Sequence, residues 1–261
     1  MGQMELRIFY NEVQNPEKEK YFWTKGLFLN RFYSYIGRKW LDTAKARREE
    51  IEGLISESDT IAKPQESSSG IGILKLNLVS AASERYKIVK MLKDRPFVLE
   101  ECVSNSGETA KFHPESLNTV RVVTVLGKSG KVSILGSFIR FGTGGNYVDN
   151  GGKDGILAEI DVDSGMVITN AFDKHRNEFD RHPDSGLLFK GFKIPEFDSI
   201  IGVCSAAAKE IPEVPIVGWD VAITKEYGIE IIEGNNRPDA YGLQSPRLKG
   251  YKSRLKELVE Q

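Results

Sequence analysis

Short apolar runs separated by glycine-containing turns dominate the second half of the chain. The runs at 119–126 and 131–141 are joined by GKSG, and VGWDVAIT is joined to IEIIEG by a similar turn, so both pairs are predicted to be β-hairpins. Apolar residues at helical spacing instead predict mostly helical structure across 17–54, 81–92 and 197–211. Hairpins mixed with helices are typical of an α+β fold rather than of a parallel, doubly wound sheet.

The composition narrows the class of protein further. With 36 basic and 37 acidic residues the net charge is −1, which argues against a nucleic-acid coat or a polybasic membrane surface. No apolar run approaches the roughly 20 residues of a membrane helix, and the first residues lack the apolar stretch of a secretory signal. Cys102 and Cys204 lie in apolar runs and are expected to be buried free thiols. The sequence therefore predicts a cytoplasmic protein that binds no nucleic acid and does not insert into membranes.

Two acidic residues are predicted to face each other in the hairpin GWDVAITKEYGIEIIEGNN. With KEYG as the connection, the opposite pairs are Thr224 with Ile229, Ala222 with Ile231, and Asp220 with Glu233. Directly opposed carboxylates lie about 5 Å apart at Cβ and repel each other, and a divalent cation would remove that repulsion. Asn235 adds a neutral oxygen on the same face, and such a donor set suits Mg²⁺. The alternative is an exposed hairpin end with solvated acids.

The other hairpin, VRVVTVLGKSGKVSILGSFIRF, brings two arginines to one face. With GKSG as the turn, Leu126 faces Lys131 and Arg121 faces Gly136. Arg121 and Arg140 then share a face with the apolar residues Val123, Val125, Val132 and Ile134. Arginine at the end of an apolar surface usually meets a carboxylate or a phosphate, and Gly136 leaves room beside Arg121 for either. The alternative is a structural salt bridge to an acid such as Glu100.

The segment IAKPQESSSGIGI places Lys63 at the end of a short strand, directly before a Ser- and Gly-rich loop. Backbone N–H groups of such a loop can hold phosphate, while the lysine supplies a positive charge. The segment differs from a Walker A sequence, which would carry Gly-Lys-Ser/Thr before a helix. A plain surface hairpin explains it equally well.

Taken in order, these segments resemble the ATP-grasp superfamily, and within it the branch called sugar-transfer-associated ATP-grasp, from about Phe22 to Gly242. TKGLF resembles the region of the family's first nucleotide lysine, and IAKPQESSSGIGI that of the second with its flexible loop. FVLEECV is similar to the hinge strand that receives adenine through backbone groups. HPESLNTVRVVTV is the phrase most particular to this branch. SFIRFGTGGNYVDNGG looks like the arginine, asparagine and double-glycine segment of glutamate-adding ATP-grasp ligases, and GWDVAIT followed by IIEGNNRP is similar to the family's metal signature.

The resemblance implies that the protein binds ATP and Mg²⁺, and it assigns residues to each role. The catalytic candidates are Arg121 and Arg140. The nucleotide-binding candidates are Lys25, Lys63, Ser68, Ser69, Gly70, Glu100, Glu101, Val103 and Asn150. The metal ligands are Asp220, Glu233 and Asn235, the same three residues that the hairpin register selects.

The resemblance also implies an ATP-grasp fold of class α+β, in which two α+β lobes hold ATP between antiparallel sheets after a short helical segment. We expect a lead at 1–20, a helical segment with the smaller lobe at 21–103, and a larger lobe with the metal site and a C-terminal helix at 104–261. Only about twenty residues precede the region of Lys25, so the additional N-terminal domain that such ligases usually carry is expected to be missing or vestigial.

The common chemistry of the family is activation of a carboxylate by the γ-phosphate of ATP, followed by attack of an amine or thiol on the acylphosphate. We therefore expect an ATP- and Mg²⁺-dependent carboxylate–amine ligase for small-molecule substrates, in surface-polysaccharide or sugar and amino-acid metabolism. The alternatives are a small-molecule kinase and a non-catalytic nucleotide-binding partner of a glycosyltransferase. His113, His175 and His182 lack metal-ligand spacing with the cysteines. His182 could approach a substrate, but a structural or solvated loop histidine is the simpler interpretation.

Overall fold

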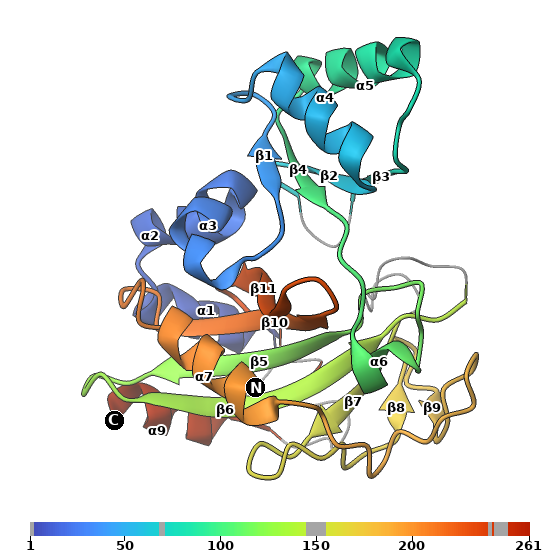
Figure 1. The fold of residues 1–261 in the computed structure, drawn as a ribbon. Helices are drawn as coiled ribbons and strands as arrows, with labels where there is room; N and C mark the ends of the chain where they lie inside the picture. Colours follow the sequence, from blue (N-terminus) through green and yellow to red (C-terminus); the bar gives the residue numbers. More distant parts are fainter. Residues whose placement is uncertain (1–2, 68–70, 145–154, 240–241, 243–249) are drawn as a thin grey trace. The chain divides into compact units, whose positions relative to one another are not determined.

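The computed structural model describes residues 3–67, 71–144, 155–239, 242 and 250–261. The chain separates into two compact units, a smaller one of Tyr21–Val103 and a larger one of Met1–Lys20 with Ser104–Gln261. Each unit has its own antiparallel sheet and its own apolar core (Figure 1). The α+β class predicted from the hairpins is confirmed. Within the described ranges, no helix is both long and apolar enough to cross a membrane.

The larger unit is built on a seven-stranded sheet with the strand order β11-β10-β5-β6-β7-β8-β9. Its strands are β5 (Thr119–Leu126), β6 (Val132–Phe141), β7 (Ile156–Ile160), β8 (Ala171–Phe172), β9 (Glu178–Phe179), β10 (Ile216–Thr224) and β11 (Gly228–Asn235). Every residue of β5, β7 and β10 is buried. Burial on both faces explains why these strands read as continuous apolar runs instead of alternating ones.

Helices from both ends of the sequence cover one face of this sheet. They are α1 (Gln3–Val13) and α9 (Lys252–Glu260), whose apolar residues share one core with strand residues such as Val123, Val125 and Phe138. Helix α7 (Phe197–Ala207) covers the opposite face in Figure 1 and buries Cys204 completely, as the sequence predicts. Cys102 of the smaller unit is only partly buried, so the predicted burial is wrong for this thiol. Two further helices are α2 (Pro16–Trp23), which follows α1, and the short α6 (Gly107–Ala110), which precedes β5.

The smaller unit is built on a four-stranded sheet with the order β1-β4-β2-β3. Its elements are α3 (Lys25–Arg31), the 3₁₀ turn η1 (Tyr33–Tyr35), β1 (Trp40–Asp42), α4 (Arg48–Glu57), β2 (Thr60–Pro64), β3 (Leu74–Leu76), α5 (Ala82–Asp94) and β4 (Phe97–Glu101). One face of the sheet, with Ala62 and Leu99, packs on α4 and α5. The stretch 17–54 is therefore less helical than predicted, because Trp40 to Asp42 pair with β4.

The register of the β10–β11 hairpin differs from the predicted one near its turn and agrees with it at the acids. The connection is one residue shorter than predicted, because Gly228 adopts a positive φ of 72° and pairs with Thr224. The pairs predicted for Thr224 and Ala222 are therefore wrong. A β-bulge at Ile232 then adds one residue and restores the predicted pairing of Asp220 with Glu233.

The β5–β6 hairpin corrects a second prediction. Leu126 pairs with Val132 instead of Lys131, and a bulge at Leu135 shifts the register once more, so Arg121 faces Phe138. The room predicted beside Arg121 is absent, because Gly136 faces Val123 instead. The one-residue change at the turn also moves the predicted face partners Val132 and Ile134 to the other side of the sheet. A one-residue shift exchanges the two faces of a strand, whereas two successive shifts return Arg121 and Arg140 to one face.

Candidate functional site

In the smaller unit, Lys63 belongs to a buried cluster of three charged side chains on the sheet face opposite α4 and α5. The carboxylate of Glu100 on β4 lies between two cations: Lys63 Nζ is 2.9 Å from Oε1, and Arg38 Nε donates to Oε2 at 2.7 Å. The Glu100 and Arg38 side chains are 4% and 2% exposed, and that of Lys63 is 16% exposed. The strand register explains the pairing, since Lys63 faces Val98 and Glu100 faces Ile61 on the same side of the sheet.

The two cations keep Glu100 ionised. Burial alone would raise the pKa of this carboxyl, but Lys63 and Arg38 outweigh that effect and hold it at about 2. Two cations and one anion leave one net positive charge in the cluster, which suits an anionic ligand. The sequence does not predict Arg38 as a member of this cluster, because no local pattern connects it with a strand more than sixty residues away.

Lys25, the other predicted nucleotide lysine, is the first residue of α3 and contacts the loop that follows β2. Its Nζ donates to the backbone oxygen of Ser67 at 2.7 Å and lies 3.2 Å from the Ser67 hydroxyl. Gln65 accepts the N–H groups of Lys25 and Gly26 at 3.1 and 2.9 Å. The loop and the lysine are therefore held together. The predicted residues Ser68, Ser69 and Gly70 lie outside the described residues, as does Asn150.

The predicted adenine hinge is the end of β4 and the residues that follow it. Here the N–H of Glu101 donates to Lys39 at 2.9 Å and that of Cys102 donates to Asp59 at 2.9 Å, while Val103 is the last residue of the smaller unit. Both backbone donors already bond within the unit. Glu100 contributes its side chain to the charged cluster instead.

In the larger unit, the structure brings together the two predicted arginines and the predicted metal ligand Asp220. Arg121 binds the carboxylate with both ends of its guanidinium, from Nε to Oδ1 at 2.5 Å and from Nη2 to Oδ2 at 2.7 Å, and Arg140 Nη2 also donates to Oδ1. The side chains of Arg121 and Asp220 are 8% and 7% exposed, and that of Arg140 is 14% exposed. The acid that the arginines meet is therefore Asp220 and not Glu100.

The strand register produces this arrangement. Asp220 on β10, the strand between β11 and β5, faces Arg121 on one side and Glu233 on the other, and Arg140 faces Thr119 two residues before Arg121. Burial would raise the pKa of Asp220, but the two guanidiniums lower it overall and keep the carboxylate charged.

The donor set of Asp220, Glu233 and Asn235 fits Mg²⁺ in chemistry, although the arginines compete for one of its members. Glu233 is exposed and makes no ion pair within the described part of the chain, and the Asn235 amide nitrogen is buried there without a hydrogen-bond partner. Two carboxylates and an amide oxygen are ligands that Mg²⁺ prefers. Asp220, however, already accepts three hydrogen bonds from arginine. In the described ranges, no cluster of three His, Cys, Asp or Glu side chains could hold a metal by itself.

The N-terminal helices hold the backbone that follows Asn235. The Tyr10 hydroxyl donates to the Pro238 carbonyl at 2.6 Å, and Arg237 donates to both oxygens of Glu19 at 2.7 and 3.0 Å. The Glu19 side chain is only 1% exposed. No sequence signal identifies these contacts, because more than 200 residues separate the partners. The expected N-terminal lead is thus part of the structure that supports the candidate metal site.

Comparison of the sequence with known protein families identifies the family. The sequence matches the family described as sugar-transfer associated ATP-grasp over residues 17–260. The chain belongs to this family. A search of curated proteins found no match.

Solved structures show that this member has the ATP-grasp fold. An N5-carboxyaminoimidazole ribonucleotide synthetase in complex with ADP has a TM-score of 0.59 at 11% identity, covering 95% of this chain and 54% of that chain. The ATP-grasp ligase PsnB with its minimal precursor has a TM-score of 0.58 at 14% identity, covering 94% and 63%. The Staphylococcus aureus N5-carboxyaminoimidazole synthetase with ADP has a TM-score of 0.55 at 10% identity, covering 94% and 53%. The chain thus spans 53–63% of the length of these proteins.

Proposed function

We propose that this family member is an ATP- and Mg²⁺-dependent ligase that activates a carboxylate for attack by an amine. The observation that carries the proposal is the buried Arg121–Asp220–Arg140 cluster next to Glu233 and Asn235, in a chain with the ATP-grasp fold. This arrangement puts cations for a transferring phosphoryl group beside oxygen ligands for a metal. The structural relatives include complexes with ADP and, for PsnB, with Mg and ADP, which supports the same ligands here.

The proposed reaction assigns a role to each charged cluster. Lys63 and Lys25 would contact the phosphates of ATP, and Arg121 and Arg140 would stabilise the charge on the phosphoryl group during transfer. Glu233 and Asn235 would hold Mg²⁺ together with Asp220, which the two arginines keep ionised. When bound, Mg²⁺ neutralises phosphate charge and orients the group to be transferred.

The proposed reaction has two chemical steps. A substrate carboxylate oxygen forms a bond to the γ-phosphorus while the bond to the β-phosphate oxygen breaks, which gives an acylphosphate and ADP. An amine then attacks the carbonyl carbon, loses a proton, and displaces phosphate to give an amide. The sugar-transfer association in the family's description supports a substrate from surface-polysaccharide or sugar and amino-acid metabolism.

Product analysis tests the reaction class. Incubation with ATP, Mg²⁺ and candidate carboxylate–amine pairs should release ADP and phosphate together with an amide. ADP with a stable phosphoester would instead indicate a kinase. Absence of ADP with every substrate pair, despite nucleotide binding, would indicate a binding module without turnover.

Replacing Lys63 by Met should weaken binding of the magnesium complex of AMPPNP by about 30-fold. A charge-assisted hydrogen bond contributes about 2 kcal/mol, which corresponds to that factor in Kd. Isothermal titration calorimetry measures Kd separately from any loss of stability caused by the remaining Glu100 charge. The control is Lys90→Met, which removes an exposed lysine from α5 on the other side of the smaller sheet. Equal Kd values for both variants would contradict a phosphate contact by Lys63.

A further inference from the structure

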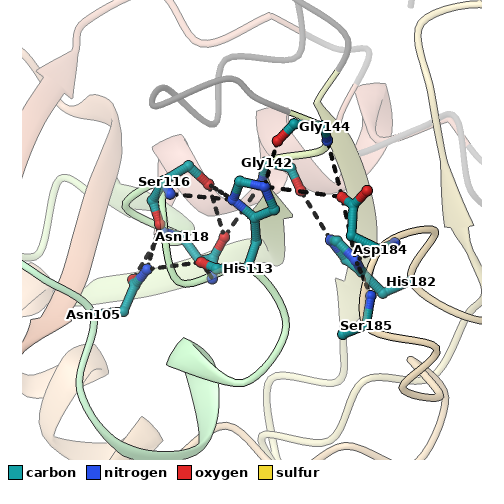
Figure 2. A network of polar contacts seen from close by, with 9 residues as sticks. All are labelled: Asn105, His113, Ser116, Asn118, Gly142, Gly144, His182, Asp184 and Ser185. Atoms are coloured by element: carbon teal, nitrogen blue, oxygen red, sulfur yellow. Dashed lines mark hydrogen bonds and ion pairs between the residues drawn. The ribbon is translucent and has the colours of Figure 1, made fainter.

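Two buried histidines hold the backbone immediately after β6, as Figure 2 shows. His113 Nε2 lies 2.7 Å from the Gly144 carbonyl oxygen, and His182 Nε2 lies 2.9 Å from that of Gly142. The two side chains are 5% and 0% exposed. They come from segments about seventy residues apart, so this histidine pair, His113 and His182, joins separate parts of the larger unit at one point.

The hydrogen bonds of the histidine pair assign the ring protons. The backbone N–H of Ser116 donates to His113 Nδ1 at 3.1 Å, and the N–H groups of Asp184 and Ser185 donate to His182 Nδ1 at 3.2 and 3.4 Å. A nitrogen that accepts a bond carries no proton, so each ring is neutral and is protonated at Nε2. Each Nε2–H then donates to a backbone carbonyl of residues 142–144.

The other residues of the network in Figure 2 contact the same backbone. Together with the histidine pair, Ser116, Asn118 and Asp184 form the socket, which surrounds residues 142–144. The N–H of Gly142 donates to Asn118 Oδ1 at 3.3 Å, and that of Gly144 donates to Asp184 Oδ2 at 2.9 Å. The socket approaches Gly142 so closely that a Cβ atom there would overlap the Ser116 hydroxyl. Buried polar networks of this kind fix one conformation when each member is satisfied.

The socket holds both strands at the end of β6 that carries Arg140. Asn118 directly precedes β5, whose first residue Thr119 pairs with Arg140, and Gly142 follows Arg140 by two residues. Arg140 in turn donates to Asp220. A movement of residues 142–144 would therefore displace the end of β6 and the guanidinium that it carries.

We infer that His113 and His182 are positioning residues which, in their neutral form, hold the end of β6 and thereby keep Arg140 on Asp220. The effect on nucleotide binding rests on the proposed function, whereas the effect on the Arg140–Asp220 contact does not. The HPESLN segment holds no catalytic or metal-binding candidate, and its role is to supply His113, Ser116 and Asn118 to the socket.

The arrangement also makes the position of Arg140 sensitive to pH. A second ring proton on His182 would point Nδ1–H at two backbone N–H groups and break both of their hydrogen bonds. The charged and titratable neighbours are Asp184, whose Oδ2 lies 3.9 Å from a nitrogen of each ring, and the other histidine, whose ring centre lies 5.9 Å away. Burial beside three phenylalanine rings outweighs both the bond to Gly142 and the charge of Asp184, and it lowers the pKa of His182.

The sign of the pH effect follows from this lowered pKa. The unfolded chain binds a proton at His182 near pH 6.5, whereas the native protein binds it only at lower pH. The contribution of His182 to the free energy of unfolding should therefore be constant above about pH 6.5 and should fall as the pH drops below that value. Replacing His182 by Asn should remove this part of the fall, which urea denaturation at about pH 5, 6 and 7.5 would measure.

The most specific variant, His182→Asn, keeps the local turn and removes only the bond to Gly142. In His182→Asn the amide oxygen can still accept from Asp184 and Ser185, but no group reaches the Gly142 carbonyl. The matched control is His175→Asn, which alters an exposed ring. Without nucleotide, NMR should show slowly exchanging Arg140 guanidinium protons in the wild type and the control. In His182→Asn these signals should broaden, because the contact with Asp220 is no longer held.

A double-mutant cycle tests whether His182 acts through Arg140. At about pH 7.5, His182→Asn should weaken binding of Mg–AMPPNP by about 5-fold, the effect of one lost neutral hydrogen bond, and should have no further effect when Arg140 is replaced by Met. An equal loss in both backgrounds would overturn the positioning role while nucleotide binding stands. If the wild type does not bind Mg–AMPPNP, the proposed function fails, and unchanged Arg140 signals in His182→Asn would still overturn the inference.

Discussion

Replacing Asp220 by Ala should lower the free energy of unfolding by about 3–5 kcal/mol, because it leaves two buried guanidiniums without their shared carboxylate. Arg121 and Arg140 are 8% and 14% exposed, so water cannot fully replace the lost oxygens. The same change should abolish magnesium-dependent nucleotide binding if Asp220 is a metal ligand. Urea denaturation monitored by the fluorescence of the fully buried Trp219, with Trp23 and Trp40 replaced by Phe, measures the stability of this unit.

The matched control for Asp220 is Glu233, its opposite neighbour on β11. Glu233→Ala should leave stability nearly unchanged, because the side chain is exposed and makes no ion pair in the described ranges. It should nevertheless weaken Mg–AMPPNP binding, which calorimetry with and without Mg²⁺ would reveal. If nucleotide binding by both variants still depends on Mg²⁺ as in the wild type, these carboxylates are not the metal site, whatever their effect on folding.

Replacing Glu100 by Gln should remove roughly 3 kcal/mol of stability from the smaller unit at neutral pH, and nothing at about pH 2 or below. The pKa of Glu100 is lowered from 4.5 to about 2, and each tenfold change in an acid dissociation constant corresponds to about 1.4 kcal/mol. A lowered carboxyl pKa stabilises the native state above the unfolded pKa, and this stabilisation is lost as the pH falls from 4.5 through about 2. Hydrogen exchange of the β2 and β4 amides measures the opening free energy of this unit alone.

The control for Glu100 is Glu57→Gln, which removes an ion pair with Lys39 in the same unit. The side chains of that pair are 60% and 61% exposed, so water screens the pair and little change is expected. The difference in stability between wild type and Glu100→Gln should converge towards zero in acid, since other carboxyls titrate equally in both proteins. A difference that stays constant from neutral pH into strong acid would show that the introduced amide perturbs packing instead of charge.

Sequence reasoning found the facing acids because two local errors cancel. The turn is one residue shorter than predicted and the bulge at Ile232 adds one residue, so Asp220 still faces Glu233. In the other hairpin the turn and the bulge at Leu135 add up, and the partner of Arg121 is wrong. Neither bulge has a glycine at the extra residue, so only packing against the two faces of the finished sheet selects them.

The remaining parts of the candidate site depend on contacts between distant segments. Strand and hairpin patterns identified the candidate lysines, arginines and acids, and the order of these segments pointed to the family that the chain matches. The sequence could not predict the roles of Arg38, of the histidine pair, or of Tyr10 and Glu19. A long stretch of chain separates each of these residues from the group that it contacts. Hydrophobic periodicity reports which face a residue occupies, not which distant element meets it.

The joint core of α1 and α9 has a consequence for synthesis on the ribosome. The apolar stripe of α1, with Leu6 and Phe9, is translated long before its partners Leu255 and Leu258 on α9. The core of the smaller unit, by contrast, is complete once Leu99 has emerged. The nascent chain must therefore carry an uncovered apolar helix while an entire unit folds behind it, a situation that favours aggregation and attracts chaperones. Chains that stop before α9 should expose the same stripe permanently.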